Sequence, residues 1–346
     1  MKKSTSLQPI KVGILGATGM VGQRLVERLH NHPQFEIAFL GASHRSMGKP
    51  YAQAATWRLS SQNPIPDMMV HECIPAEYPD DVALLFSALD TKPAKTIEAE
   101  AVKTGRYVVS NASAFRMDSK TPLIIPEVNP GHLRLLAGKP GIITNPNCCA
   151  IPLALSLAPL QDLGIKAVCV STYQAVSGAG YPGESAWDMI GNVHPHAGNE
   201  EHKLSIEPQK ILGTISQASD FPISARCVRV PTADGHLLGV QVLLANPITV
   251  QEAKERFKNY TSPCPALPSS PHPLFIVHER RDRPSPRFDI MAGDGMAISI
   301  GRVEPCAVMS LKYFVLAHNT IRGAAGAAIA NAELLLTSNL LSRDTL

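Results

Sequence analysis

A strand-like run leads into a glycine-rich turn at Lys11-Val12-Gly13-Ile14-Leu15-Gly16-Ala17-Thr18-Gly19-Met20-Val21-Gly22. The turn contains the pattern G-x-x-G-x-x-G, and an amphipathic helical pattern with Leu25, Val26 and Leu29 follows it. Such glycines permit a tight turn and let the backbone approach a pyrophosphate, whose charge the helix N-terminus offsets. Because strand, glycines and helix come in this order, the stretch favours a dinucleotide site over an ordinary glycine-rich turn.

The sequence beyond this turn predicts the rest of the fold. Strand-like runs at 35–40, 82–86 and 107–109 occur among helical patterns at 21–30 and 94–104. This alternation predicts a parallel, doubly wound sheet. Later strand-like runs, at 168–176, 226–230 and 237–244, have fewer helices between them, and the Ala- and Leu-rich run 322–340 predicts a C-terminal helix. The expected class is therefore α/β, with a Rossmann-type first domain and an α+β second domain.

The choice of dinucleotide depends on the end of the second strand-like run. Sites for NAD usually carry Asp or Glu there, to bind the ribose 2′-hydroxyl. This chain has Gly41-Ala42-Ser43-His44-Arg45-Ser46, which contains no acidic residue. Because Ser43, Arg45 and Ser46 can bind and neutralise a 2′-phosphate, NADP is the expected cofactor.

Composition excludes several other classes of protein. The chain has 346 residues, with 32 Lys and Arg interspersed among 29 Asp and Glu, so no basic patch for nucleic acid is predicted. No apolar run is long enough to span a membrane and no signal peptide is visible, so we expect a cytoplasmic protein. The seven cysteines form no C-x-x-C pair and leave one over, which argues against a disulfide framework and a zinc site. We expect no metal.

The candidate nucleophile lies in Thr144-Asn145-Pro146-Asn147-Cys148-Cys149-Ala150, just before an apolar helical run from 151 to 160. A cysteine at a helix N-terminus meets the positive end of the helix dipole and free backbone N–H groups, which favour its thiolate. Buried structural cysteines are common, so local sequence alone does not rank Cys148 above Cys149.

Two further strand-like runs, 225–231 and 236–242, are joined by Thr232-Ala233-Asp234-Gly235. We expect a hairpin in which Arg229 and His236 share one face, so that an arginine able to bind a carboxylate lies beside a histidine able to move protons. A structural histidine is the alternative. Glu200 and Lys203 share a helix face, and the glycine-rich loop 174–183 suits contact with a flat ligand such as nicotinamide.

Taken together, these segments resemble the aspartate-semialdehyde dehydrogenase family, nearer to its archaeal and fungal branch. The resemblance covers almost the whole chain. The motifs that carry it, besides the glycine-rich turn, are Ala42-Ser43-His44-Arg45-Ser46, Phe86-Ser87-Ala88-Leu89-Asp90, Asn145-Pro146-Asn147-Cys148, Gln174-Ala175-Val176-Ser177-Gly178-Ala179-Gly180-Tyr181, Arg229-Val230-Pro231, Asp234-Gly235-His236 and His318-Asn319-Thr320-Ile321-Arg322-Gly323-Ala324-Ala325-Gly326.

The resemblance implies an enzyme that reduces L-aspartyl-4-phosphate with NADPH to aspartate semialdehyde and inorganic phosphate, in the synthesis of lysine, threonine and methionine. It implies a thioester on Cys148, with His236 as general acid/base. Substrate-binding residues would be Gln174, Glu200 and Arg229, with Arg116, Lys203 and Asn111 at the phosphate. The implied cofactor-binding residues are Gly16, Ala17, Thr18, Gly19, Met20, Val21, Ser43, Arg45, Ser46, Ser87, Ser177, Gly178 and Asn319.

The resemblance also implies the domain organisation. Residues 1–147 would form the NADP-binding Rossmann domain, completed by a returning C-terminal helix within 319–346. Residues 148–318 would form the catalytic, substrate-binding and dimerisation domain of a homodimer or homotetramer. One departure concerns Cys149, which stands where the family usually has Ser or Thr.

Three other functions remain open at this point. Malonyl-CoA reductase resembles the same family and would use the same thioester, but it has no need of a phosphate site. N-acetylglutamyl-phosphate reductase is more distant, because its catalytic motif differs. A non-catalytic NADP-binding module would need the glycines and Arg45, but it would not need Cys148, Arg229 and His236 together.

Overall fold

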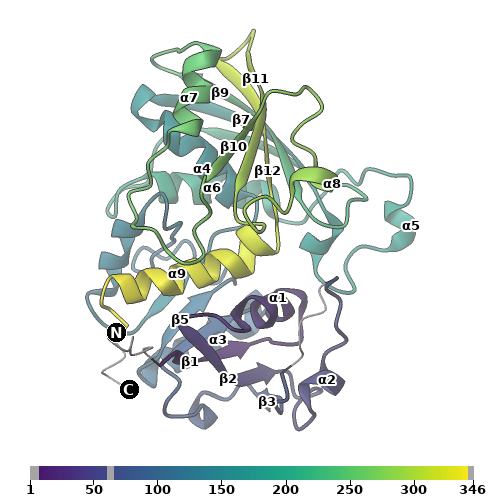
Figure 1. The fold of residues 1–346 in the computed structure, drawn as a ribbon, viewed down its shortest axis with the longest axis vertical. Coiled ribbons are helices and arrows are strands. Elements are labelled where there is room, and N and C mark those ends of the chain that lie inside the picture. The colour runs from purple at the N-terminus through teal and green to yellow at the C-terminus, as the bar shows by residue number, and fades with distance from the viewer. Residues whose placement is uncertain (1–7, 61–65, 342–346) are drawn as a thin grey trace, which may run out of the picture.

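The computed structural model describes residues 8–60 and 66–341, which fold around two six-stranded sheets. Figure 1 shows the sheets one above the other, with the last long helix, in yellow, running between them. In this part of the chain, no helix is both long and apolar enough to cross a membrane.

The first sheet has the strand order β3-β2-β1-β4-β5-β6, and every pairing in it is parallel. This order is typical of a dinucleotide-binding fold and confirms the predicted doubly wound sheet. Its strands are β1 (Ile10–Leu15), β2 (Phe35–Ala42), β3 (His71–Glu72), β4 (Leu84–Ser87), β5 (Tyr107–Ser110) and β6 (Ile142–Thr144).

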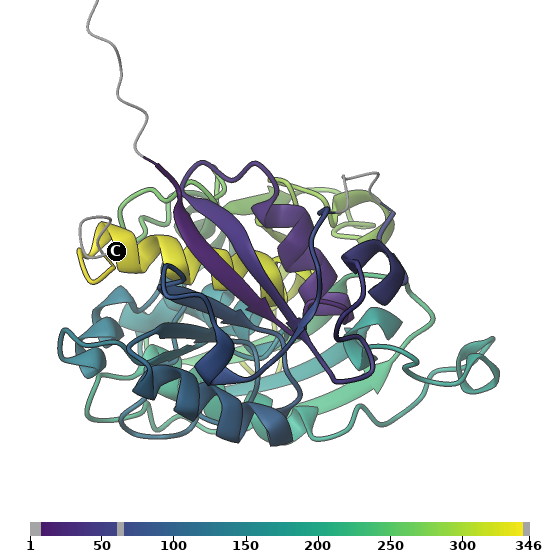
Figure 2. The same ribbon diagram turned by 90° about the horizontal axis from the view of Figure 1, so that it is seen from below.

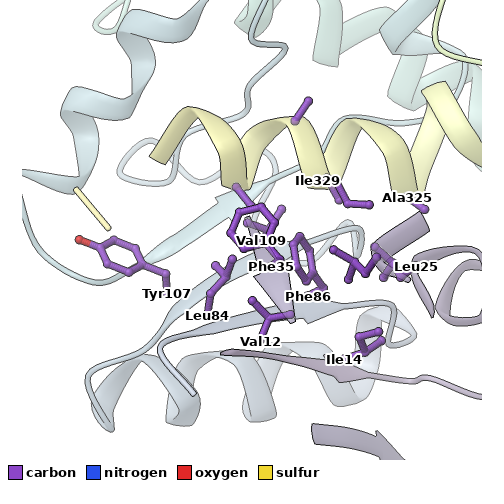
Figure 3. Close-up of a cluster of buried hydrophobic side chains, with 14 of the residues drawn as sticks. Val12, Ile14, Leu25, Phe35, Leu84, Phe86, Tyr107, Val109, Ala325 and Ile329 are labelled. Atoms are coloured by element: carbon purple, nitrogen blue, oxygen red, sulfur yellow. The ribbon is translucent and has the colours of Figure 1, made fainter. Parts of the chain in front are cut away.

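Helices cover both faces of this sheet because alternate strand residues point to opposite sides. Val12, Ile14 and Phe86 pack on one side with Leu25 of α1 (Met20–Leu29) and Ile329 of α9 (Gly326–Thr337). Figure 3 shows this cluster beneath α9. The alternate strand residues pack on the other side against α3 (Thr91–Lys103), and Figure 2 shows the helices on either side of the strands. The C-terminal helix thus returns to the first sheet, as predicted.

The second sheet has the order β10-β11-β12-β9-β7-β8 and mixes parallel with antiparallel pairs. Apolar residues of α4 (Ala150–Leu157), α6 (Glu200–Leu212) and α7 (Val250–Lys258) bury one of its faces. On the opposite face, Tyr173 is 41% and Leu243 is 38% exposed. Its strands are β7 (Ile165–Gln174), β8 (Ile223–Arg229), β9 (His236–Leu244), β10 (Phe275–His278), β11 (Ile298–Pro305) and β12 (Leu311–Ala317).

The predicted hairpin of 225–231 with 236–242 is wrong. β8 and β9 do not pair, because β7 lies between them, parallel to β8 and antiparallel to β9. The turn residues 232–235 therefore connect two strands across the end of β7. This places the end of β7, at Gln174, between Arg229 and His236.

The remaining elements are short. The run predicted as a helix over 151–160 is α4 followed by the 3₁₀ helix η3 (Ala158–Leu163). The predicted C-terminal helix begins with a π-helical turn, η5 (Ile321–Ala325), before α9. The others are α2 (Tyr51–Ala54), α5 (Ala186–Met189), α8 (Pro286–Asp289), η1 (Pro75–Glu77), η2 (Pro130–Leu136) and η4 (Val176–Ala179).

Candidate active site

Two adjoining cavities follow the carboxyl ends of the first sheet, where open α/β sheets bind their ligands. The larger, of about 680 Å³, begins at the glycine-rich turn, and the smaller, of about 320 Å³, contains Cys148. They share the lining residues Met20, Val21, Leu89, Asp90 and Gly180. A ligand in the first cavity can therefore reach Cys148 in the second.

Most of the predicted cofactor residues line these cavities. Gly16, Thr18, Gly19, Met20, Val21 and Ser43 line the larger one, and Ser177, Gly178 and Asn319 line the smaller one. Ala17 and Ser87 are fully buried and do not line either cavity. Arg45 and Ser46 lie beyond the lining, in the turn after β2, and Arg45 is exposed.

Cys148 lies at the entrance to α4, where Asn147 organises the turn. The Asn147 Oδ1 accepts hydrogen bonds from the backbone N–H groups of Cys149 (2.9 Å) and Ala150 (3.2 Å). The pKa of the Cys148 thiol is held well below its usual range, chiefly by a hydrogen bond from the Cys149 thiol, with His236 and Arg116 adding to the effect. Burial raises the pKa of Cys149, which keeps that thiol protonated. The two cysteines are therefore unequal: their surroundings favour the thiolate on Cys148 and the thiol on Cys149.

Arg229 and His236 converge on the same point although their strands do not pair. A Cβ atom built on Gly178 would lie 2.9 Å from both Arg229 Nη1 and His236 Nε2. Arg229 Nη1 donates to the Gln174 side-chain oxygen and to the Ala175 carbonyl, each at 3.1 Å. The predicted neighbourhood of arginine and histidine is thus present, and the end of β7 organises it.

The predicted phosphate residues Asn111, Arg116 and Lys203 line the smaller cavity together with Cys148. Arg116 Nη1 forms an ion pair with Glu207 at 3.0 Å, and the other Glu207 oxygen accepts from the Asn147 backbone N–H at 2.6 Å. Lys203 Nζ donates a hydrogen bond to one carboxylate oxygen of Glu200 at 2.7 Å. The other Glu200 oxygen accepts a hydrogen bond from Asn147 Nδ2. Helix α6 therefore holds both cations beside the turn that carries Cys148.

The segment before α9 also lines the smaller cavity, with Asn319 and Gly323. Asn319 accepts from the Gly235 backbone N–H at 2.8 Å and donates to the Ser177 hydroxyl at 2.8 Å. In the π-helical turn, a Cβ atom on Gly323 would lie 2.8 Å from the Cys148 Cβ. Only glycine permits this approach, so the turn packs directly against the nucleophile.

Three buried nitrogen atoms of the predicted site residues have no hydrogen-bond partner within the described residues: Arg116 Nε, Arg229 Nε and His236 Nε2. Arg229 Nε nevertheless lies 4.0 Å from the carboxylate of Glu184, with which it forms an ion pair. Buried donors are normally paired, because an unpaired buried donor costs about 1–3 kcal/mol. Because Arg116 and His236 are both neighbours of Cys148, these nitrogen atoms favour an anionic ligand that supplies oxygen atoms.

A metal ion is a poorer fit to the same atoms. The Sγ atoms of Cys148 and Cys149 and a ring nitrogen of His236 lie within 4.8 Å of one another. However, a histidine that binds a metal usually donates its other ring N–H to an acceptor. Here Nδ1 instead accepts from the Ala175 backbone N–H at 3.1 Å.

Sequence reasoning missed several residues of the site. Glu207 follows Glu200 and Lys203 at helical spacing, so the shared helix face could have indicated it. Arg58 and Tyr181 line the larger cavity and stack on each other, with the guanidinium 3.3 Å from the ring centre. Their separation of more than a hundred residues gave no sequence signal. Glu72 lines this cavity as well.

Comparisons with known proteins agree with this geometry. The family model described as "Semialdehyde dehydrogenase, NAD binding domain" matches residues 11–136, and "Semialdehyde dehydrogenase, dimerisation domain" matches residues 157–322. The sheet order, the glycine-rich turn and the cysteine beside it define a two-domain oxidoreductase of the semialdehyde dehydrogenase class.

Individual relatives narrow the class. The chain is 44% identical to an aspartate-semialdehyde dehydrogenase of Archaeoglobus fulgidus, over 95% of this chain and 99% of that protein, and 40% identical to that of Schizosaccharomyces pombe, over 96% and 99%. It superposes with a TM-score of 0.87 on the crystal structure of the Candida albicans enzyme with NADP, at 36% identity over 96% of this chain and all of that one. The chain belongs to the aspartate-semialdehyde dehydrogenase family.

Proposed function

We propose that this protein catalyses the NADPH-dependent reduction of L-aspartyl-4-phosphate to aspartate semialdehyde and inorganic phosphate, reversibly, in aspartate-family amino-acid biosynthesis. The observation that carries the proposal is the activated Cys148 together with buried nitrogen atoms of Arg116, Arg229 and His236 that have no hydrogen-bond partner within the described residues. The substrate is an anion with a phosphate at one end and a carboxylate at the other, so it can use all three.

The larger cavity fits NADP. A Cβ atom on Gly22 would come within 2.1 Å of the Gly16 carbonyl oxygen, so the turn needs glycine for the close strand–helix packing of a dinucleotide site. The residues proposed to hold the cofactor are those of the turn, Ser43 and Arg45 at the 2′-phosphate, and Ser177, Gly178 and Asn319 near the nicotinamide. When bound, the cofactor supplies the hydride.

The substrate is proposed to lie across the smaller cavity. Arg229 would bind its carboxylate and Glu200 its amino group, with Gln174 orienting the acyl group. Arg116 and Lys203 would bind the phosphate, supported by Asn111, whose backbone carbonyl accepts from Arg116 at 2.6 Å. Both cations line the smaller cavity together with Cys148.

The covalent chemistry falls to Cys148, with His236 as the second catalytic residue. The thiolate attacks the acyl carbon, forming the S–C bond, and the C–O bond to phosphate then breaks. The phosphate leaves with the bonding electron pair and takes up a proton from water, which leaves a thioester on Cys148. Hydride addition to the thioester and release of the thiolate give the aldehyde.

Assembly and location form part of the proposal. We propose that residues 148–318 form the catalytic and dimerisation domain, and that the open face of the second sheet, with Tyr173 and Leu243, packs on a second copy. Sedimentation should then give the mass of a homodimer, or of a homotetramer built from it. The seven free cysteines suit the cytoplasm.

The phosphate requirement of the reverse reaction is the decisive test. Aspartate semialdehyde should be oxidised with NADP only when phosphate is present, and Arg116→Ala should raise the KM for phosphate more than the KM for the aldehyde. Cys148→Ala should abolish turnover while leaving NADPH binding intact. Oxidation that needs coenzyme A instead of phosphate would replace the proposal with malonyl-CoA reductase.

A further inference from the structure

We infer that Glu207 is a positioning residue, whose carboxylate fixes the phosphate-binding Arg116 beside the turn that carries Cys148. Glu207 is buried in α6 and lines neither of the two cavities, so it acts on the substrate only through its neighbours. The role of Arg116 at the phosphate rests on the proposed function, whereas its contacts with Glu207 do not.

The two carboxylate oxygens of Glu207 have different partners. Oε1 accepts a hydrogen bond from Arg116 Nη1 at 3.0 Å, and Oε2 accepts one from the Asn147 backbone N–H at 2.6 Å. Asn147 immediately precedes Cys148 in the chain. Because the Glu207 side chain is only 2% exposed, both contacts are shielded from water and are stronger than they would be at the surface. One carboxylate therefore links the arginine to the nucleophile's turn.

The backbone around Arg116 is held by the same helix. Lys210 lies three residues after Glu207 on the same face of α6, and its Nζ donates to the Arg116 carbonyl oxygen at 2.6 Å. Nζ also donates to the carbonyl oxygens of Asp118 and Thr121, at 2.7 and 2.8 Å. All three donors of the ammonium group thus bind this loop. Lys210 fixes the backbone of the arginine, which leaves the placement of the guanidinium to Glu207.

Both the charge and the length of the Glu207 side chain matter for this link. Arg116 is buried, and a buried cation that loses its acidic partner is strongly destabilised. Glu207→Gln could accept from only one of the two N–H groups, because its amide nitrogen would face the other donor. Glu207→Asp keeps the charge but is one methylene group shorter, so it would not span Arg116 and Asn147. The two variants break the link in different ways.

Glu201 provides a matched control on the same helix. It accepts hydrogen bonds from Arg226 at 3.4 Å and from the Cys227 backbone N–H at 3.2 Å, so it also links an arginine to a backbone amide. However, this arginine is exposed and Glu201 lines neither cavity. Glu201→Gln should therefore leave the KM for phosphate unchanged. A rise in this KM would show that the site responds to any loss on α6.

A double-mutant cycle between Glu207 and Arg116 tests the link, with the KM for inorganic phosphate in the oxidation of aspartate semialdehyde as the readout. We expect Glu207→Gln and Glu207→Asp to raise this KM by about tenfold or more, since each weakens a charge-assisted contact. In the Arg116→Ala background the same substitutions should change it by less than about twofold, because no arginine is left to displace. The KM for NADP should stay at its wild-type value.

A second measurement does not require turnover. Inorganic phosphate in the smaller cavity should slow the alkylation of Cys148 by iodoacetamide, and the concentration for half-protection should follow the same cycle. NADPH binding identifies the folded variants, and either Glu207 variant completes the cycle.

The outcomes separate the inference from the proposed function. A wild-type protein that does not respond to phosphate would overturn both. A normal wild-type response that both Glu207 variants keep would overturn the role of Glu207 alone. The same is true of a Glu207 effect that is equally large with and without Arg116, because it would not act through that arginine.

Discussion

Cys148 owes its reactivity to neighbours from distant parts of the chain. Arg116 comes from the loop after β5, His236 from the start of β9, and only Cys149 is adjacent in sequence. Its position before an apolar helix predicted a reactive thiol, because the effect of a helix N-terminus is local. The ranking of Cys148 over Cys149 could not be predicted from local sequence, since it depends on which sulfur faces His236.

Cys149 can be tested as the donor to the thiolate. We expect Cys149→Ala to raise the pKa of Cys148, because it removes the hydrogen bond that contributes most to lowering it. The pH dependence of inactivation by iodoacetamide should then move to higher pH. Cys149→Ser keeps a hydroxyl donor and should stay nearer to the wild-type profile. Equal profiles for Cys149→Ala and the wild type would show that Cys149 has no part in activation.

His318 gives the fold a pH dependence of its own. Burial, with Arg24 and Arg28 nearby, lowers its pKa from the ordinary 6.5 to about 4. Between these values the unfolded chain binds a proton that the folded protein excludes, so the free energy of unfolding decreases as the pH falls from 6.5 toward 4. The loss amounts to as much as about 3 kcal/mol.

Urea denaturation at several pH values within this window measures the effect. His318→Gln should show a smaller decrease than the wild type, although His132 and His278, whose pKa values burial also lowers, keep part of it. An unchanged pH dependence in the variant would rule out His318 as the source.

At the scale of elements, the elements of the first domain were predictable and the pairing of strands in the second was not. The glycine-rich turn, β1 and α1 form a local unit whose order is visible in sequence. β8 and β9 follow each other along the chain, and consecutive strands often pair, which is why a hairpin was expected. The strand between them, β7, comes from much earlier in the chain, and nothing in the sequence from 225 to 242 indicates that it pairs with both.

The π-helical turn positions Cys148 through Gly323. We expect Gly323→Ala to lower kcat by about 10²-fold, because the added methyl group would lie 2.8 Å from the Cys148 Cβ and displace the nucleophile. Steady-state kinetics with a parallel measurement of NADPH binding test this. Gly131→Ala is the matched control, because a Cβ there meets nothing within 4 Å. If Gly323→Ala kept the wild-type kcat, the π-helical turn would have shifted to make room for the methyl group without displacing the Cys148 sulfur.

In the molecule as a whole, the C-terminal helix α9 packs against the sheet formed by the first part of the chain. The Ala- and Leu-rich run predicted the helix, and the family resemblance predicted its return to the first domain. Periodicity alone could not predict its position, because residues apolar on nearly every side have no preferred face. The open face of the second sheet could not be predicted from the sequence either. Tyr173 and Leu243 lie together on an exposed face only once β7 and β9 are paired in the sheet.

Ile329 reports how much this helix stabilises the first sheet. It is 1% exposed and packs with Val12, Ile14 and Phe86. We expect Ile329→Ala to lower the free energy of unfolding by about 2–5 kcal/mol, and Ile329→Val, which leaves a smaller cavity, by about 0.5–1.5 kcal/mol. Urea denaturation measures both. Equal, small losses would mean that the helix end packs loosely.

The return of α9 has a consequence for synthesis on the ribosome. The strands of the first sheet emerge early, but the helix that covers one of its faces is among the last segments translated. The roughly 200 residues between β5 and α9 take about 10–40 s to make, and during that time only α1 covers the face of the sheet that it shares with α9. The part of this face that α9 covers therefore stays exposed in the nascent chain until translation is nearly complete.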